Sequence, residues 1–155
     1  MTHLCHQFQR ATQRQTDLAL FVFDLDFFKR VNDTYGHAAG DQVLRRVAKL
    51  LQHVTRASDI VARFGGEEFL VVLPDASAEI AGNIAERVCT MIRRLKIGPD
   101  LIEITASIGV SLRYNAAQTH VHLTAQELLK QADRALYRAK AIGRDRVSYF
   151  AEQAA

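Results

Sequence analysis

The feature that most constrains the fold is a short polar loop between two apolar runs. The runs are Ile60–Phe64 and Phe69–Leu73, and the loop that separates them reads Gly65-Gly-Glu-Glu68. Two apolar runs joined by a short glycine-containing loop predict a β-hairpin. A hairpin among helical segments argues against a doubly wound parallel sheet, in which helices join the strands. We therefore expect an α+β fold, with an antiparallel or mixed central sheet and helices packed on it.

Three further segments have the character of strands. The run Leu18–Phe23 is continuously apolar, which is typical of a buried strand. Residues Ile102–Leu112 alternate apolar and small or polar side chains, so we expect a half-buried strand with one solvated face. A last strand is expected near Arg146–Phe150.

Helices are predicted between these strands. Residues 1–16 read as a polar helical lead-in, a short helix is expected over Phe27–Asn32, and an apolar stripe over Val43–Val54 indicates a longer helix. Ser77 can cap another helix. Thr124-Ala-Gln-Glu127 forms a capping box, and the helix that it opens is expected to stop at Gly143.

Composition indicates one soluble domain, residues 1–155, with 48% hydrophobic residues. Cys5 and Cys89 are far apart, which favours free thiols and a cytoplasmic setting. No apolar run approaches the length of a membrane helix, and we expect no membrane insertion. The net charge of +3 fits ordinary solvated helix faces or an anionic nucleotide, and we expect no nucleic acid partner.

Two acidic clusters are the first candidates for chemistry. Asp24 and Asp26 end the apolar strand, and Glu67 and Glu68 occupy the hairpin loop. If the hairpin pairs with the first strand, both clusters meet at one edge of the sheet. Converging carboxylates repel each other, and Mg²⁺ or Mn²⁺ would relieve that repulsion. The alternative is that all of them are solvated turn residues.

Several residues near these acids suit a nucleotide. Gly65 and Gly66 can supply unusual backbone dihedrals and let a bulky ligand approach. Lys29 follows a helix start whose amides suit phosphate. Asn32 and Asp41 could read a purine edge, although a helix terminator and an N-cap are their structural alternatives.

Other polar signals are less informative. The chain contains neither a Walker A sequence nor Gly-x-Gly-x-x-Gly, so a nucleoside triphosphate would be held by metals, loop amides and scattered bases. His37 lies in a turn and is expected to be structural, and His120 and His122 are expected at the surface.

Together these motifs resemble the GGDEF family of diguanylate cyclases, with Gly65-Gly-Glu-Glu-Phe69 as the form that has Glu in place of Asp. The further matching segments are Asp24–Lys29, Asn32-Asp33, Tyr35–His37, Gly40-Asp41, Ala106–Val110, Ala132–Tyr137, Ala139-Lys140 and Gly143-Arg144. The resemblance covers about Leu18 to Phe150. It implies a fold similar to the palm of nucleotidyl cyclases and polymerases, with a ferredoxin-like core.

The resemblance also implies an activity, the condensation of two GTP molecules into cyclic di-GMP with release of pyrophosphate. Two metal ions per active site, Mg²⁺ or Mn²⁺, would be held by Asp24, Glu67, Glu68 and the Leu25 carbonyl. Glu68 would alternatively help to activate the 3′-hydroxyl, and the expected catalytic residues are Asp24, Glu67 and Glu68. The residues expected to bind substrate are Phe27, Phe28, Lys29, Asn32, Asp41, Gly65, Gly66, Lys140 and Arg144.

Two copies of the domain would face each other as a transient homodimer, because each 3′-hydroxyl attacks the other nucleotide. A second site, where the product would inhibit, is implied by Arg56-Ala-Ser-Asp59 and Arg87. The structural alternative is a helix-end arginine and a strand-start aspartate.

One departure concerns the N-terminus. Many relatives carry a Leu-Thr-Gly-Leu-x-Asn-Arg stretch and an input domain upstream, and neither is present, so we expect a catalytic fragment with weak, concentration-dependent activity. Two other functions compete: a non-catalytic receptor for GTP or cyclic di-GMP, and a polymerase-like palm acting on nucleic acid. The retained acids favour the enzyme over the receptor, and the lack of basic stretches interleaved with aromatics disfavours the palm.

Overall fold

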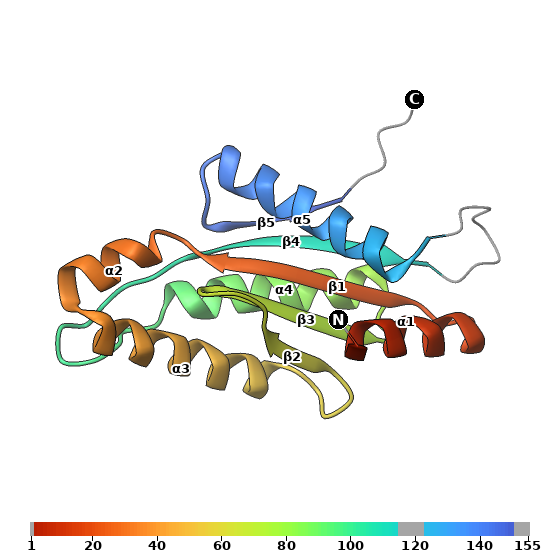
Figure 1. Ribbon diagram of the computed structural model, residues 1–155, viewed down its shortest axis with the longest axis horizontal. Coiled ribbons are helices and arrows are strands. Elements are labelled where there is room, and N and C mark those ends of the chain that lie inside the picture. The colour runs from red at the N-terminus through yellow and green to blue at the C-terminus, as the bar shows by residue number, and fades with distance from the viewer. Residues whose placement is uncertain (1, 115–122, 151–155) are drawn as a thin grey trace.

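The structure is a computed structural model that describes residues 2–114 and 123–150, so His120 and His122 lie outside the described residues. Figure 1 shows its elements, which are α1 (Thr2–Arg14), β1 (Leu18–Leu25), α2 (Phe28–Tyr35), α3 (His37–Val54), β2 (Ile60–Arg63), β3 (Glu68–Pro74), α4 (Ala78–Arg93), β4 (Ala106–Arg113), α5 (Ala125–Ala141) and β5 (Arg146–Tyr149).

The strands form one mixed sheet in the order β2-β3-β1-β4-β5. The first four strands are antiparallel to their neighbours, and β5 alone is parallel to its neighbour β4. Strand order 2-3-1-4 with antiparallel neighbours is the ferredoxin-like arrangement, and β5 extends it through the crossover helix α5. The mixed sheet and the predicted hairpin are therefore confirmed.

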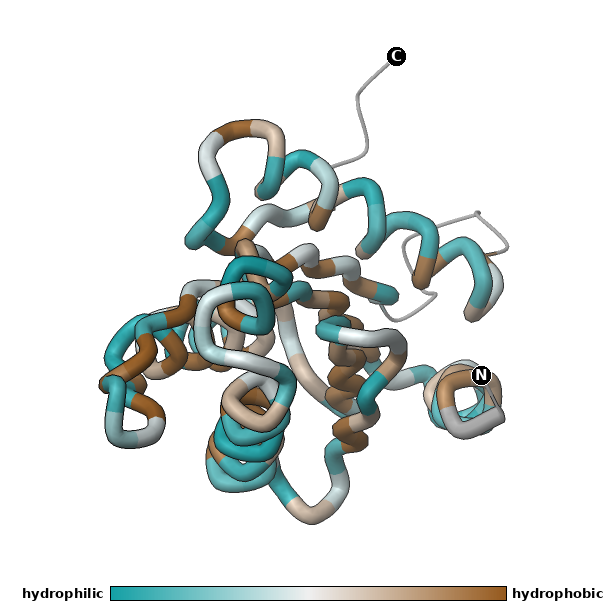
Figure 2. The backbone as a smooth tube through the Cα atoms, turned by 60° about the vertical axis from the view of Figure 1, so that its left-hand side comes forward, coloured by the Kyte–Doolittle hydropathy of each residue, from teal (hydrophilic) through white to brown (hydrophobic). Residues whose placement is uncertain are grey.

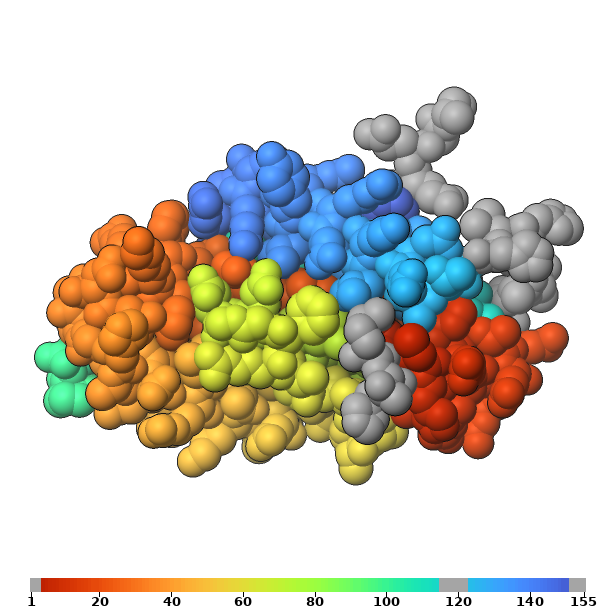
Figure 3. All heavy atoms as spheres, in the orientation of Figure 1, coloured from red at the N-terminus to blue at the C-terminus, as the bar shows by residue number. Residues whose placement is uncertain are grey.

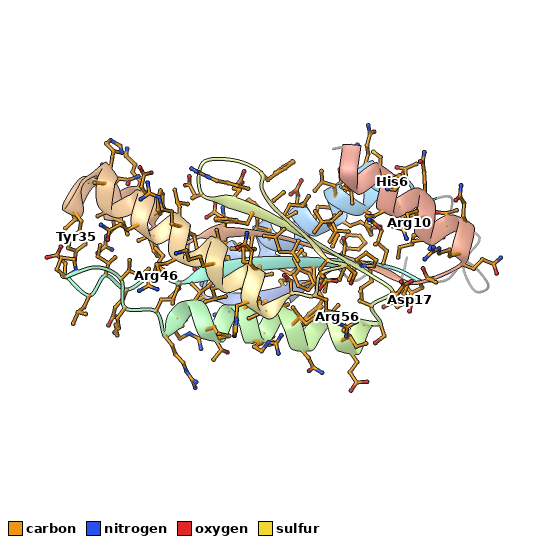
Figure 4. The ribbon with its side chains drawn as sticks, turned by 90° about the horizontal axis from the view of Figure 1, so that it is seen from below. His6, Arg10, Asp17, Tyr35, Arg46 and Arg56 are labelled. Carbon is orange, nitrogen blue, oxygen red and sulfur yellow. The ribbon has the colours of Figure 1, made fainter. Side chains whose placement is uncertain are left out.

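Helices cover both faces of the sheet, and alternate residues of β1 pack against each layer. Ala19, Phe21 and Phe23 face α2, α3 and α4, whereas Leu20 and Val22 face α1 and α5. Figure 4 shows α4 on one side of the sheet and α1 on the other, and Figure 2 shows hydrophobic strands at the centre of the molecule. Burial on both faces explains why the sequence of β1 is continuously apolar.

The expectation of a half-buried strand over Ile102–Leu112 was wrong in two respects. The strand begins only at Ala106, and its polar face is buried under α5 instead of solvated. The Ser111 hydroxyl donates to the Leu128 carbonyl at 2.8 Å. Gly109 lies so close to α5 that an added Cβ would overlap the backbone of Ala132 and Leu136. Small side chains here permit helix contact, which the alternation pattern alone does not distinguish from solvent exposure.

The helix boundaries refine two expectations. The capping box of α5 is confirmed, with Thr124 and Glu127 bonded reciprocally. Asp41 is not an N-cap, because α3 begins at His37 after Gly36, whose φ of 82° separates α2 from α3. Within the described ranges, no helix combines the length and hydropathy that crossing a membrane requires.

Candidate functional site

A cleft of about 430 Å³ lies between α2, α3 and the hairpin loop. Its lining consists of Phe28, Lys29, Asn32, His37, Asp41, Leu44, Arg63, Gly66 and Glu67. Six of these residues were predicted for substrate or metal from sequence, and they come from three separate segments of the chain. Figure 3 shows the surface of the hairpin, in yellow-green, between α2–α3 in orange and α5 in blue.

Asn32 and Asp41 reach the same cleft because α2 and α3 pack against each other. Gly40 is buried at their contact, and an added Cβ would overlap the Asn32 side-chain oxygen. Asn32 is not a helix terminator, since it lies inside α2, where its carbonyl accepts from the Gly36 amide at 2.9 Å. The Asn32 amide group and the Asp41 carboxylate therefore share one wall, as reading a purine edge requires.

Arg63 braces the loop of the hairpin. Its guanidinium donates to the Gly65 carbonyl at 3.2 Å and to the Gly66 carbonyl at 2.6 and 3.0 Å. The expectation that these glycines supply unusual dihedrals was wrong, because neither has a positive φ. An added Cβ on Gly65 would come within 2.6 Å of a Glu68 carboxylate oxygen, whereas one on Gly66 would meet nothing within 4 Å. Gly65 thus leaves room for Glu68, and Gly66 leaves the cleft open.

The acids of β1 and of the hairpin lie at the same end of two neighbouring strands, as expected. Asp24 and Glu68 are register partners on β1 and β3, and both lie on the face that α5 covers. Lys140 of α5 pairs with Asp24, with 3.0 Å between Nζ and Oδ2. Among the described residues, Asp24 is the only one of Asp24, Glu67 and Glu68 that is ion-paired.

The donor set suits a hard divalent cation, since it offers carboxylate oxygens at adjacent positions and a backbone carbonyl at Leu25. The side chains are not gathered around one point, however. In the described ranges, no three His, Cys, Asp or Glu side chains come together closely enough to hold a metal ion. The residues thus fit Mg²⁺ by chemistry, although Oδ2 of Asp24 is paired with Lys140 here.

Asp26 differs from Asp24 although it lies only two residues away. It is 3% exposed, and its carboxylate accepts hydrogen bonds from Thr105, Ser107 and the Asp145 amide. Asp26 therefore has a structural role, and it does not line the cleft that contains Glu67.

The start of α2 presents amides beside these acids. No side chain caps α2, and Phe27, its N-cap residue, has a left-handed backbone with φ of 57°. The Phe27 ring is exposed, and the guanidinium of Arg144 lies 4.8 Å from its centroid. Amides and a base close to one helix start form a suitable anion site.

The predicted second site forms a separate loop between α3 and β2. Figure 4 shows Arg56 far from Tyr35, which ends α2. The Asp59 carboxylate accepts from the Arg56 amide at 2.7 Å, and Arg87 of α4 donates to the Val54 carbonyl at 2.7 Å. Arg56 and Asp59 therefore lie on one loop, and Arg87 of α4 contacts the end of α3 just before that loop. These contacts are compatible with a structural role and with ligand binding.

Sequence reasoning missed Arg63 and the contribution of His37 to the cleft. Arg63 could have been found from hairpin register, because it opposes Phe69 beside the loop. His37 was expected to be structural, but it lines the cleft. The pairing of Lys140 with Asp24 depends on the packing of α5 against β4, and no local sequence signal reports that packing.

Comparison with known proteins shows which family this chain resembles. A family model described as "Diguanylate cyclase, GGDEF domain" matches residues 1–146. Diguanylate cyclase A of Treponema denticola is 43% identical over 150 residues, which cover 96% of this chain and 39% of that relative. The chain therefore spans less than half of that relative's length.

Two solved structures extend the likeness to the fold. The active GGEEF domain of a diguanylate cyclase from Vibrio cholerae superposes with a TM-score of 0.90 at 31% identity, covering 98% of this chain and 94% of that one. The GGDEF domain of DgcB from Caulobacter crescentus, in complex with c-di-GMP, gives 0.84 at 33% identity, covering 96% and 86%. On sequence and structure together, this chain belongs to the GGDEF domain family of diguanylate cyclases.

Proposed function

We propose that this chain catalyses the condensation of two GTP molecules into cyclic di-GMP. The observation that carries the proposal is the cleft in which Asn32 and Asp41 lie together with the signature residue Glu67. In the reaction, each 3′-oxygen forms a bond to the α-phosphorus of the other nucleotide. The bond from that phosphorus to the β-phosphate bridging oxygen breaks, two pyrophosphates leave, and each 3′-hydroxyl gives up its proton.

Guanine would be recognised on the wall formed by α2 and α3. The Asp41 carboxylate can accept from N1–H and N2–H₂ of guanine, and the Asn32 amide can complete the pattern. Adenine has no N1–H and no 2-amino group, so its Watson–Crick edge would set the N1 lone pair against the Asp41 carboxylate where guanine offers two adjacent donors. GTP is therefore preferred to ATP.

The triphosphate would lie toward the start of α2 and the end of α5. The amides of Phe27 and Phe28, with Lys29, Lys140 and Arg144, supply donors and positive charge there. Asp24, Glu67, Glu68 and the Leu25 carbonyl would hold Mg²⁺, or Mn²⁺ in its place, at two ions per site. Such a cation lowers the pKa of a bound hydroxyl and stabilises charge on the phosphates.

Two copies would have to face each other, since one domain offers one guanine cleft in its described part. The proposal therefore includes a transient homodimer and a cytoplasmic setting that supplies GTP. The product would bind a second time at Arg56, Asp59 and Arg87 and inhibit. The Arg56 side chain is exposed, and Arg87, with five N–H donors, uses one on the Val54 carbonyl in the contacts seen here.

A non-catalytic receptor for GTP or cyclic di-GMP is the alternative. The pairing of Asp24 with Lys140, in place of a gathered metal site, is the observation that favours it.

The test is incubation with GTP and Mg²⁺ at several protein concentrations, with products resolved by mass. Cyclic di-GMP that rises faster than linearly with protein, and disappears in Glu67→Ala, supports the dimeric enzyme. Glu79→Ala is the matched control, because it removes an exposed acid from the first turn of α4. Absence of product together with tight, Arg56-dependent cyclic di-GMP binding would favour the receptor.

A further inference from the structure

Both carboxylate oxygens of Asp26 accept hydrogen bonds from other residues of the chain. Its Oδ2 accepts from Thr105 Oγ1 at 2.8 Å and from the Asp145 amide at 3.0 Å, and its Oδ1 accepts from Ser107 Oγ at 2.7 Å. A buried carboxylate is stable only when its oxygens are satisfied in this way. These bonds tie the end of β1 to β4 and to the turn between α5 and β5.

That turn has an unfavourable backbone. Gly143, Arg144 and Asp145 have φ values of 120°, 61° and 48° in succession. Glycine tolerates such values, but Arg144 and Asp145 each pay a conformational cost that persists only where surrounding contacts enforce it. The Arg144 amide closes α5 on the Ala139 carbonyl at 2.9 Å, and the Asp145 amide is held by Asp26.

Arg93 of α4 holds the same turn from the other side. Its Nε donates to both carboxylate oxygens of Asp145, at 2.8 and 3.1 Å, and its Nη2 donates to the Asp145 carbonyl at 3.2 Å. The hydrogen bond to Asp145 raises the pKa of the Arg93 guanidinium, so Arg93 stays protonated. Asp145 is therefore hydrogen-bonded through its amide to Asp26, and through its carbonyl and carboxylate to Arg93.

The turn and the helix before it each carry a base near the proposed substrate site. Arg144 lies over the Phe27 ring, at the uncapped start of α2, and Lys140 lies one helical turn earlier and pairs with Asp24. Moving the turn would shift the Arg144 guanidinium relative to the α2 amides.

We propose that Arg93, Asp145 and Asp26 are positioning residues that fix Arg144, and with it Lys140, for binding the triphosphate of the substrate. The inference rests on the proposed function, since it names residues that serve the same site without touching the nucleotide. Arg93 belongs to α4, which packs on the opposite face of the sheet from α5. The sequence motifs assign α4 no part in the active site.

The test compares Arg93→Ala with Arg94→Ala. Both variants remove one exposed positive charge from the end of α4, but only Arg93 contacts Asp145. Calorimetry measures the affinity of each purified chain for a non-hydrolysable GTP analogue with Mg²⁺ and for guanosine. We expect Arg93→Ala to weaken the analogue on the order of tenfold, with guanosine unchanged, because only the phosphate grip is misplaced. Arg94→Ala should leave both affinities as they are.

Asp145→Asn keeps an acceptor for Arg93 but loses the charge, and an intermediate loss of analogue affinity is expected. Equal weakening of analogue and guanosine by Arg93→Ala would show a general structural role and overturn the inference, as would analogue affinity equal to wild type. A wild-type chain that binds guanosine and the analogue equally well would overturn it too, because no phosphate grip would exist. Binding of neither ligand to wild type would overturn the proposed function as well.

Discussion

The cleft beside the hairpin and the loop Arg56–Asp59 both carry polar side chains that suit guanine and phosphate, yet they differ in what holds those side chains. In the cleft, Asn32 and Asp41 come from two helices and are brought together by packing at Gly40. In the loop, the Asp59 carboxylate already accepts from the Arg56 backbone amide at 2.7 Å. The recognition groups of the cleft are therefore placed by helix packing, whereas in the loop a ligand would compete with or share an internal hydrogen bond of Asp59.

The largest difference between the two regions is expected when Asp41, the proposed acceptor for guanine, is removed. Asp41→Ala should lower the rate of cyclic di-GMP formation on the order of a hundredfold at subsaturating GTP, because a charged hydrogen-bond acceptor is lost from the site. Asp59→Ala should leave the initial rate unchanged. Initial rates at low product, measured for both variants, provide the comparison, and a similar loss in both would contradict it.

Gly40→Ala tests whether packing alone assembles the cleft. The added methyl group would displace the Asn32 side chain, so we expect about tenfold weaker GTP binding and a free energy of unfolding lower by about 1–3 kcal/mol. Calorimetry and urea unfolding measure the two effects. Ala38→Gly, two residues earlier on the exposed face of α3, is the control, and it should leave GTP affinity unchanged. Wild-type GTP affinity in Gly40→Ala would show that Asn32 is not needed.

In the loop, Asp59→Ala should have two modest effects. The free energy of unfolding should fall by about 1 kcal/mol, because the Arg56 amide loses its side-chain acceptor. Product inhibition should weaken by about tenfold if the second site operates. Progress curves with added cyclic di-GMP measure the inhibition. An unchanged inhibition constant would restrict Asp59 to its structural role.

A buried thiol reports whether these variants keep the fold. Burial, and next the charge of Asp145, raise the pKa of Cys89 to about 11, so the thiolate is about a hundredfold rarer than in a thiol of pKa 9. Alkylation at pH 8 should modify Cys5 first and Cys89 slowly, in wild type and in Asp41→Ala, Gly40→Ala and Asp59→Ala. The variants of Arg93 and Asp145 are left out of this control, because both side chains contact the Cys89 thiol. Since the folded pKa is raised, the associated stability is complete below pH 9 and declines toward pH 11. Fast labelling of Cys89 in one variant would show that its loss of activity reflects unfolding.

The sequence predicted the elements that depend on local pattern, including the hairpin, the buried strand β1 and the capping box at Thr124. It also predicted six residues of the cleft, because their motifs match the family closely. It did not predict that Ser111 and Gly109 are buried, since small residues facing a helix have the same pattern as a solvated face. The local pattern grouped Asp24 with Asp26, and only the family resemblance singled out Asp24. The physical difference depends on Thr105, Ser107 and the distant Asp145 amide, which bond Asp26. The sequence could not predict tertiary contacts, in particular which polar groups are hydrogen-bonded by residues far away in the chain.

The most direct test of the central claim is to map where the nucleotide binds, using ¹⁵N NMR of the chain with Mg²⁺ and a non-hydrolysable GTP analogue. The account predicts that the largest shifts occur at the Asn32 side-chain amide and at the backbone amides of Lys29, Asp41 and Gly66. ATP analogues at the same concentration should cause much smaller changes. Shifts centred on Arg56–Asp59, with the cleft undisturbed, would contradict the account.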